Sequence, residues 1–498
     1  MVFFVSLFLT FASTLQAAIP QAERDALIAL YNDTAGDSWT DNTNWRDPGD
    51  PLQFNTAGTE GTWYGITLDT TGDHVEKIVL TFDGLTGTLP DVSALTGLKE
   101  LRLTGNALSG SLPTHLTNLS ALEWLDLSSN QFSGTMPDLS VLTQLNVLFL
   151  SSNSLSGSIP TWLNSMPGLA RLSLGNNQFS GTIPDLSNLT GLLLLRLKDN
   201  QLTGTIPTYL NTFSSLYCLD LAGNQLTGTI PDLTSTNMMD LYLGNNQLTG
   251  TIPTWLNTIT GLRYLGLGHN QLTGTIPDLS SLTALTVIEL NHNQLTGGIP
   301  TWLGSIPDLY RLNLGNNLLT GTIPNFGSLP DLDYLYLGNN KLSGNIPAEI
   351  GNLTGLRYLE LQGNRLQGNM PVELDNLWNL EDTYGLDISY NGLYTGDYNL
   401  DTFIGSKQNT DWRDTQTIAP VGLAAAEDST TEVTVSWTPI QYQADSGGYE
   451  IYYTTTSGSD YELGGTVTDK STDSYMVTGL SPGTTYYFAV KAFTNSHS

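Results

Sequence analysis

One phrase returns along most of the chain and constrains its fold more than any other feature. Between Leu101 and Pro113 it reads LRLTGNALSGSLP, and later copies follow the pattern LxLxxNxLxGxIP. Intervals between successive copies alternate between 23 and 24 residues, with one of 22 and a last one of 27. Such a period is typical of a solenoid, whose units bury their apolar side chains against their neighbours. The repeated asparagines are Asn106, Asn130, Asn153, Asn177, Asn200, Asn224, Asn246, Asn270, Asn293, Asn317, Asn340, Asn364 and Asn391, and Asp83 takes this place in a degenerate first turn. The pattern predicts about fourteen repeats.

The two leading leucines of the phrase predict a short strand in every repeat. Residues two apart in a strand point to the same side, so Leu265 and Leu267 share the buried side. Stacked repeats then form one parallel β-sheet on a concave face over residues 75–395. The asparagine that follows each strand is expected to be structural, because its side chain can pair turn backbone that burial would leave without a partner.

These residues resemble the plant-type class of leucine-rich repeats, which occurs in receptor-kinase ectodomains and polygalacturonase-inhibiting proteins. The resemblance implies an α/β-type leucine-rich-repeat solenoid. Residues 23–31 and 63–69 look like the helix and first strand of that class's N-terminal cap, assigned to residues 18–74. Leu68 stands where plant caps usually carry a disulfide cysteine, so the arrangement is more similar to secreted proteins of bacteria or marine microbes.

A second, all-β domain is predicted after the repeats end. Residues 396–417 form a C-terminal cap and linker, and residues 418–498 alternate apolar and polar residues in several short strands. The phrase LSPGTTY that ends at Tyr486 resembles the tyrosine corner of fibronectin type III domains, with Trp437 as the core tryptophan. The resemblance predicts a fibronectin type III sandwich. The chain stops directly after the strand that contains Tyr486, so a truncated domain is expected.

The apolar N-terminal stretch and the acidic net charge indicate an extracellular binding protein. Residues 1–17 form an apolar stretch ending in small residues, which predicts a signal peptide and a secreted or cell-surface protein. No later segment is apolar enough to span a membrane. The net charge of -30 disfavours nucleic-acid partners. The single cysteine, Cys218, forbids an internal disulfide and is expected to be inert.

Catalytic, metal and cofactor sites are not predicted. The five histidines lack metal-binding spacing, and no nucleophile, phosphate loop or paired catalytic acid is present. His269 and His292 occupy the same position in adjacent repeats and share their neighbourhood with Glu289. A two-histidine metal site there is conceivable, but two polar residues on a binding surface are favoured.

Residues that flank the strand leucines are expected to bind a protein or polysaccharide ligand. Aromatic rings with polar tips and a few fixed charges form the kind of surface that anchors peptides or stacks on sugars. The alternative explanation is that aromatic residues simply favour strands. The candidates are Trp124, Phe149, Arg171, Arg196, Lys198, Tyr242, Tyr264, Arg311, Tyr334, Tyr336, Tyr358 and Glu360.

Two alternatives to adhesion remain at this stage. One is ice binding by a stacked row of Thr-x-Thr phrases, such as those at residues 203–205, 227–229, 249–251, 273–275 and 320–322. The other is that the chain is the ligand-recognition ectodomain of a larger receptor.

Overall fold

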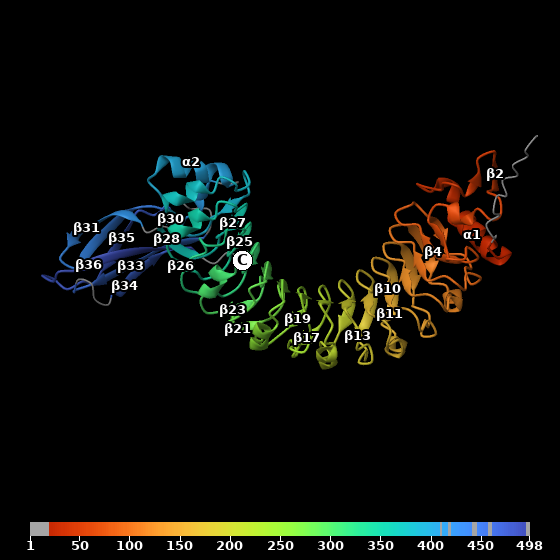
Figure 1. The fold of residues 1–498 in the computed structure, drawn as a ribbon. Coiled ribbons are helices and arrows are strands. Elements are labelled where there is room, and N and C mark those ends of the chain that lie inside the picture. Colours follow the sequence, from red (N-terminus) through yellow and green to blue (C-terminus); the bar gives the residue numbers. More distant parts are fainter. Residues whose placement is uncertain (1–18, 409–410, 417–419, 441–445, 457–460, 495–498) are drawn as a thin grey trace, which may run out of the picture. The chain divides into compact units, whose positions relative to one another are not determined.

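A computed structural model describes residues 19–408, 411–416, 420–440, 446–456 and 461–494 (Figure 1). The chain divides into two compact units, Met1–Asn246 and Gln247–Ser498. The predicted signal peptide, residues 1–17, lies outside the described residues. Within them, no helix combines the length and apolar character needed to cross a membrane.

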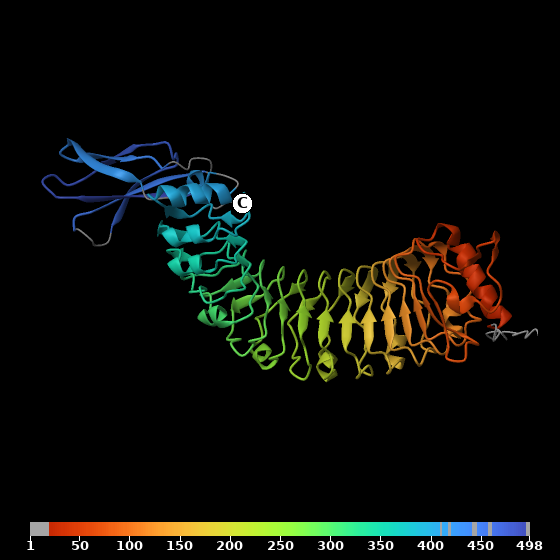
Figure 2. The same ribbon diagram turned by 45° about the horizontal axis from the view of Figure 1, so that its top comes forward.

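The first unit is built on a sheet whose strands follow one another in chain order. The first pair is antiparallel, and every later neighbour is parallel, in a register that sets leucine beside leucine, as with Leu125 and Leu148. These leucines are fully buried, whereas the residues flanking them lie on the opposite side, here called the sheet face. Figure 2 shows the yellow strands of this unit side by side. The strands are β3 (Ile66–Leu68), β4 (Val75–Val79), β6 (Glu100–Arg102), β8 (Trp124–Asp126), β10 (Val147–Phe149), β12 (Arg171–Ser173), β14 (Leu194–Arg196), β16 (Cys218–Asp220) and β18 (Asp240–Tyr242).

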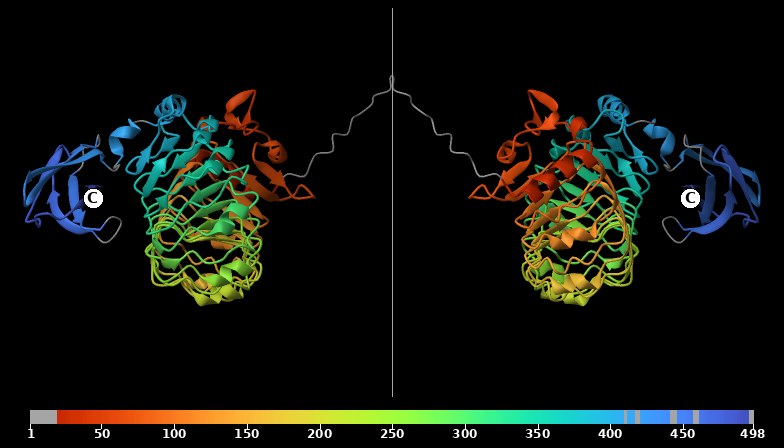
Figure 3. Two further views of the ribbon diagram at one scale, coloured as in Figure 1. Left: turned by 90° about the vertical axis from the view of Figure 1, so that its left-hand side faces the viewer. Right: turned by 90° about the vertical axis from the view of Figure 1, so that its right-hand side faces the viewer.

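The repeated asparagine connects consecutive turns. Asn130 accepts a hydrogen bond from the Leu108 N–H at 3.0 Å and donates to the carbonyls of Leu103 and Leu127 at 2.9 and 3.1 Å. Buried backbone groups of two turns are thereby paired. Seen along the coil, the yellow turns repeat one outline (Figure 3). Flanking elements are β5 (Thr86–Thr88), β7 (Ala107–Ser111), β9 (Gln131–Gly134), β11 (Ser154–Ser158), β13 (Gln178–Thr182), β15 (Gln201–Thr203) and β17 (Thr227–Gly228), with 3-10 turns η3 (Thr114–Asn118), η4 (Thr161–Ser165) and η5 (Thr208–Thr212).

An N-terminal cap covers the first repeat with aromatic rings rather than with a disulfide. Tyr31 on the helix packs against Trp39 at 5.0 Å between ring centroids, Trp39 against Trp45 at 5.1 Å, and Trp45 against Trp63 at 4.8 Å. This cluster shields the end of the solenoid from water. The cap consists of α1 (Gln21–Asp33), η1 (Gly36–Ser38), β1 (Arg46–Asp47), β2 (Asp50–Phe54) and η2 (Glu60–Thr62).

The second unit continues the same architecture and adds a C-terminal cap. In the cap, Asp397 accepts hydrogen bonds from the Asn399 and Leu400 N–H groups and so caps the helix α2. The sheet strands are β20 (Tyr264–Gly266), β22 (Val287–Glu289), β24 (Arg311–Asn313), β25 (Tyr334–Tyr336), β27 (Tyr358–Glu360) and β29 (Leu386–Asp387). The other elements are β19 (Gln247–Leu248), β21 (Thr273–Thr275), β23 (Gln294–Thr296), β26 (Ser343–Gly344), β28 (Arg365–Asn369), β30 (Gly392–Tyr394), η6 (Thr254–Thr258), η7 (Thr301–Ser305), η8 (Ala348–Asn352), η9 (Val372–Asn376), α2 (Tyr398–Lys407) and η10 (Trp412–Thr415).

The chain ends in an antiparallel sandwich of two three-stranded sheets, ordered β31-β32-β35 and β34-β33-β36. Its core contains Trp437, whose ring centroid lies 4.9 Å from that of Tyr449. The strands are β31 (Val421–Ser429), β32 (Glu432–Thr438), β33 (Gly447–Thr454), β34 (Glu462–Val467), β35 (Ser474–Thr478) and β36 (Tyr487–Thr494). The predicted fold class, a parallel-sheet solenoid followed by an all-β sandwich, is confirmed. Eight parallel strands of the first unit and six of the second account for the fourteen repeats.

Candidate functional site

Three tyrosines gather on the sheet face of the second unit. Tyr334 and Tyr358 are opposite each other in register on β25 and β27, and their rings stack with centroids 5.2 Å apart and 7° between planes. Tyr336 lies on the same strand as Tyr334, at 6.0 Å. Tyr310, which precedes β24, meets Tyr334 edge-on at 5.4 Å. We call Tyr334, Tyr336 and Tyr358 the tyrosine platform.

Arg311 fixes one side of this platform. Its guanidinium carbon lies 5.2 Å from the ring centroid of Tyr334 and 5.3 Å from that of Tyr336. Its Nε lies 2.5 Å from a carboxylate oxygen of Glu289, and Asn313 donates to the other oxygen at 2.9 Å. The Nε–H does not point along a hydrogen bond to any described residue, so the Glu289 contact acts chiefly through charge. Burial raises the pKa of Glu289 while Arg311 opposes that rise.

The opposite side of the platform is acidic. Glu360 follows Tyr336 in register, and Asp387 follows Glu360. Burial raises the pKa of Tyr336 to about 12, so its phenol stays protonated at neutral pH. The platform is therefore a half-buried aromatic surface between a neutralised arginine and two carboxylates. Glu289 and Asp387 were not among the predicted candidates, although both stand directly beside a strand leucine, which was the available signal.

A second cluster lies on the sheet face of the first unit. Trp124 and Phe149 meet nearly perpendicularly at 6.0 Å, and Arg102, which was not among the predicted candidates, lies 4.0 Å over the Trp124 ring. Arg102 forms an ion pair with Glu100, which also lies 3.2 Å from Lys77. The Trp124 indole N–H is buried and has no partner among the described residues. Here both cations are already paired with Glu100.

The remaining candidates are distributed over sheet strands of both units. Arg171 lies half-buried on β12, and within the described chain it forms no ion pair. Arg196 is opposite Asp220 in register, and Lys198 lies 3.8 Å from Asp199. Tyr242 and Tyr264 are half-buried on β18 and β20, which belong to different units. Burial raises the pKa of the Cys218 thiol, which is 1 % exposed.

The two histidines do lie together. Their rings stack at 4.0 Å with 18° between planes, and the His269 Nε2 lies 3.2 Å from the Asn291 amide. Burial and the neighbouring His269 lower the pKa of His292, so the His292 ring is uncharged at neutral pH. Among the described residues, no three histidine, cysteine, aspartate or glutamate side chains are placed to share a metal ion.

Contacts between successive turns of the solenoid explain the rows of Thr-x-Thr phrases. The Thr227 hydroxyl donates to the Gly204 carbonyl at 3.2 Å, and Thr273 does the same to Gly250. A Cβ atom at Gly228 would lie 3.0 Å from the Thr205 methyl carbon of the preceding turn. The phrase therefore joins turns with its hydroxyls and fills the space over glycine with its methyl groups.

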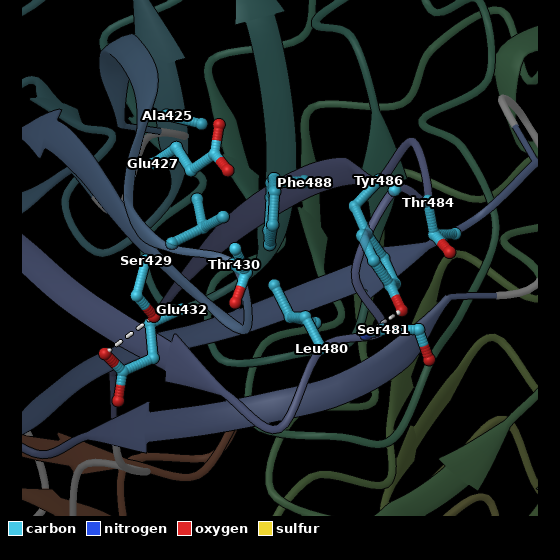
Figure 4. Close-up of a pocket in the computed structure, with 12 residues that line it drawn as sticks. Ala425, Glu427, Ser429, Thr430, Glu432, Leu480, Ser481, Thr484, Tyr486 and Phe488 are labelled. Atoms are coloured by element: carbon cyan, nitrogen blue, oxygen red, sulfur yellow. Dashed lines mark hydrogen bonds between the residues drawn. The ribbon is translucent and has the colours of Figure 1, made fainter.

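The sandwich carries one hollow of its own, of about 320 Å³, lined in part by Glu427, Val433 and Phe488 (Figure 4). Beside it, the Tyr486 hydroxyl accepts a hydrogen bond from the Ser481 N–H at 2.9 Å. This hydrogen bond closes the loop that leads into β36. It explains the tyrosine in the LSPGTTY phrase structurally.

Comparison with known protein families identifies both architectures. Residues 419–498 match the fibronectin type III domain. Residues 73–132, 236–295 and 307–366 match one leucine-rich-repeat family, and residues 144–166 and 215–236 match a second one. The chain therefore contains leucine-rich repeats followed by a fibronectin type III domain.

Similar proteins place the repeats among the plant type. Pollen receptor-like kinase 6 of Arabidopsis thaliana is 35% identical over 120 residues, which cover 22% of this chain and 16% of the kinase. The crystal structure of PEPR1-AtPEP1 matches with a TM-score of 0.64 at 29% identity, covering 80% of this chain and 55% of that one. The Arabidopsis receptor kinase HAESA, in complex with the peptide hormone IDA and the co-receptor SERK1, matches with a TM-score of 0.64 at 30% identity. This match covers 75% of this chain and 65% of the HAESA chain.

A third solved structure has a higher sequence identity than these two structures, over a shorter part of this chain. The leucine-rich-repeat ectodomain of GASSHO1/SCHENGEN3 from Arabidopsis thaliana, in complex with CASPARIAN STRIP INTEGRITY FACTOR 2, is 36% identical, with a TM-score of 0.57 over 66% of this chain and 42% of that one. The chain thus spans about half the length of these receptor chains and about a sixth of the kinase. The relatives point to a non-catalytic, ligand-binding domain.

Proposed function

We propose that this chain is an extracellular recognition protein that binds an extended polypeptide on the sheet face of its second unit, at the tyrosine platform. The single observation that carries this proposal is the stacked, half-buried pair Tyr334 and Tyr358 with Tyr336 beside it. Tyrosine offers a large apolar contact area and a polar tip at little entropic cost, which suits it to anchor a ligand.

The strand spacing of the sheet face favours an extended peptide over a folded protein as the ligand. Adjacent parallel strands lie about 4.8 Å apart, and an extended peptide advances about 3.3 Å per residue. A peptide of about five or six residues that crosses β24, β25, β27 and β29 would therefore meet all three tyrosines. HAESA, whose solved complex contains the peptide hormone IDA, supports the same ligand class.

The test uses the full chain on arrays of nonapeptides and of soluble polysaccharides. Tyr334→Ala/Tyr336→Ala/Tyr358→Ala removes the platform. Tyr384→Ala/Tyr394→Ala/Tyr398→Ala is the matched control, because these three tyrosines are exposed outside the platform. We expect peptide binding that the platform variant loses at least tenfold and the control keeps.

Two results would contradict the proposal. Binding confined to polysaccharides would assign the chain to a different ligand class and favour adhesion to a sugar surface. Peptide binding lost equally in both triple variants would show that the platform is not the site.

A further inference from the structure

Two arginines on the sheet face of the first unit form no ion pair with any described residue. Arg171 on β12 is half-buried, and Arg196 on β14 is exposed. The other basic side chains of the sheet face, on β4, β6 and β24, are each paired with a glutamate. In the described part of the chain, the side chain of Arg171 has no hydrogen-bond partner either. Its N–H donors therefore remain available to a ligand.

Packing explains the stem of Arg171 but not its charged end. Arg171 lies between Val147 and Leu194 in register, and these two apolar side chains are only 1% and 5% exposed although they belong to the sheet face. The methylene stem of an arginine can cover such neighbours. A methionine would cover them as well and would need no hydrogen-bond acceptor. The guanidinium therefore requires a different explanation.

The register brings the two guanidiniums within reach of each other. Ser173 follows Arg171 by two residues on β12 and points to the same face, and Arg196 is its partner on β14. Ser173 thus lies about 6.6 Å from Arg171 along the strand and about 4.8 Å from Arg196 across the strands. Because the serine side chain between them is small and largely buried, both arginine side chains have room to converge above it.

The nearest carboxylate does not neutralise the two arginines. Asp220 is opposite Arg196 in register, but it is 7% exposed and forms no ion pair with Arg196. Burial raises the pKa of Asp220, while the Ala222 N–H, Lys198 and Arg196 oppose that rise. Even when Asp220 is ionised, it supplies one negative charge beside two guanidiniums. The sheet face therefore keeps an excess of positive charge here, in a chain whose net charge is -30.

The chemistry of this place selects a carboxylate carried by a peptide. A guanidinium presents a planar fork of donors that matches the two oxygens of a carboxylate. Polyanions are repelled by the acidic surface of the whole chain, whereas a single carboxylate on an uncharged peptide is repelled least. Phe149, the partner of Ser173 on β10, is half-buried beside the arginines and offers a ring to the residue next to the acid.

We propose that Arg171 and Arg196 bind the carboxylate of a glutamate or aspartate side chain in a polypeptide ligand. The two arginines lie in the first unit and the tyrosine platform in the second, so this is a separate recognition site. It goes beyond the proposed function and does not depend on the platform.

The experiment measures binding of the full chain to three nonapeptide libraries that differ only in the central residue, which is glutamate, glutamine or lysine. The other positions exclude charged residues, and the C-termini are amidated, so that the central glutamate carries the only carboxylate. Arg171→Met/Arg196→Met removes both guanidiniums and keeps apolar stems over Val147 and Leu194. Lys341→Met/Arg365→Met is the matched control, because these two residues are exposed at equivalent places of adjacent repeats and form no ion pair with a described residue.

We expect the native chain to bind the glutamate library at least tenfold more tightly than the glutamine library, and the lysine library most weakly. In Arg171→Met/Arg196→Met the glutamate-to-glutamine ratio should fall towards one, whereas the control should keep it. Raising the salt from 50 to 500 mM should lower the ratio for the native chain, since a partly exposed ion pair is screened.

Three outcomes would overturn the inference. One is a native chain that binds peptides without preferring glutamate, which leaves the proposed function standing. Another is a glutamate preference that Arg171→Met/Arg196→Met retains, which places the acid elsewhere. The third is an equal loss of preference in Lys341→Met/Arg365→Met, which would make the overall charge responsible rather than the site.

The platform variant Tyr334→Ala/Tyr336→Ala/Tyr358→Ala separates this inference from the proposed function. It should keep the glutamate-to-glutamine ratio, and loss of the ratio there would assign the acid to the platform instead. Absence of any peptide binding by the native chain rejects both proposals. Arg171→Gln/Arg196→Gln is a second variant that should also lose the preference, and thermal unfolding checks that each variant keeps its fold.

Discussion

Tyr334 and Tyr358 stack almost parallel across two neighbouring strands, with ring centroids 5.2 Å apart. The leucines beside them, Leu335 and Leu359, are paired in register and fully buried behind the rings. The positions of both rings are thus set by the leucine ladder of the solenoid. The strands of the repeat alone position both rings and form this flat aromatic surface.

The stacked pair should be energetically coupled. Aromatic pairs contribute about 0.5–1.5 kcal/mol beyond the area they bury. A double-mutant cycle with Tyr334→Ala and Tyr358→Ala, measured by urea unfolding, should show this coupling. Tyr334→Ala combined with Tyr398→Ala is the control and should be additive, because Tyr398 is 80% exposed on α2. Additivity in the stacked pair as well would mean that the rings do not stabilise each other.

The asparagine ladder predicts a large effect from a single small change. Asn130→Ala removes the acceptor for the Leu108 N–H and the donor to the Leu103 carbonyl, both in buried surroundings. Each unpaired buried group costs about 1–3 kcal/mol, so we expect a loss of about 3 kcal/mol in the free energy of unfolding. Gln131→Ala changes an exposed neighbour and should cost less than about 0.5 kcal/mol. Equal unfolding midpoints for the two variants would contradict the structural role of Asn130.

The period of the leucines predicted the solenoid, its fourteen strands and the side of the sheet on which the residues flanking the leucines lie, because a strand's alternation places its side chains directly. It did not predict the aromatic core of the N-terminal cap, since Trp39, Trp45 and Trp63 follow no period. Nor did it predict β31 and β34 of the sandwich. Periodic patterns report burial within the repeat, whereas these elements are held by contacts between residues distant in sequence.

The candidate site was predicted only in part. Position beside a leucine was sufficient to select Tyr334 and Tyr358. It could not reveal that Arg311 is neutralised by Glu289, or that Asp387 adds a second charge beside Glu360. Those relationships depend on which side chains meet across neighbouring strands.

The burial of Glu360 beside Asp387 should be visible as a pH dependence of stability. The pKa of Glu360 is raised in the folded chain, so the folded state holds this proton more tightly than the unfolded state. Ionisation of Glu360 therefore costs stability above its folded pKa, and that cost disappears as the pH falls towards the unfolded value of about 4.3. Glu360→Gln should stabilise the protein by about 0.2–1 kcal/mol at pH 7.

Urea unfolding at pH 7, 5.5 and 4 measures this difference. The advantage of Glu360→Gln should shrink with falling pH and vanish near pH 4. Glu349→Gln, at an exposed position, should show no such trend. A Glu360→Gln variant that is less stable than the native chain at pH 7 would show that hydrogen bonding and the charge of Arg311 more than offset the burial of the Glu360 carboxylate.

The glycine of the repeated Ser-Gly-Thr or Thr-Gly-Thr phrase offers a way to separate backbone strain from crowding. Gly134 and Gly228 hold the same place in their repeats and the same φ of 78°. A Cβ atom at Gly134 would meet nothing within 4 Å, whereas at Gly228 it would lie 3.0 Å from the Thr205 Cγ2. Gly134→Ala should therefore cost only the conformational penalty, about 1–2 kcal/mol in the free energy of unfolding. Gly228→Ala should cost more, by about 1 kcal/mol.

Thr205→Ser, which removes the crowding methyl group, should return Gly228→Ala to the cost of Gly134→Ala and no further, because the backbone strain remains. Urea unfolding of Gly134→Ala, Gly228→Ala, Thr205→Ser and Thr205→Ser/Gly228→Ala measures the free energies of unfolding to be compared. If Gly134→Ala and Gly228→Ala are equally destabilising, the threonine methyl groups do not pack on the glycines. The Thr-x-Thr row would then lose its structural explanation, and its hydroxyls and methyl groups would again require a functional one.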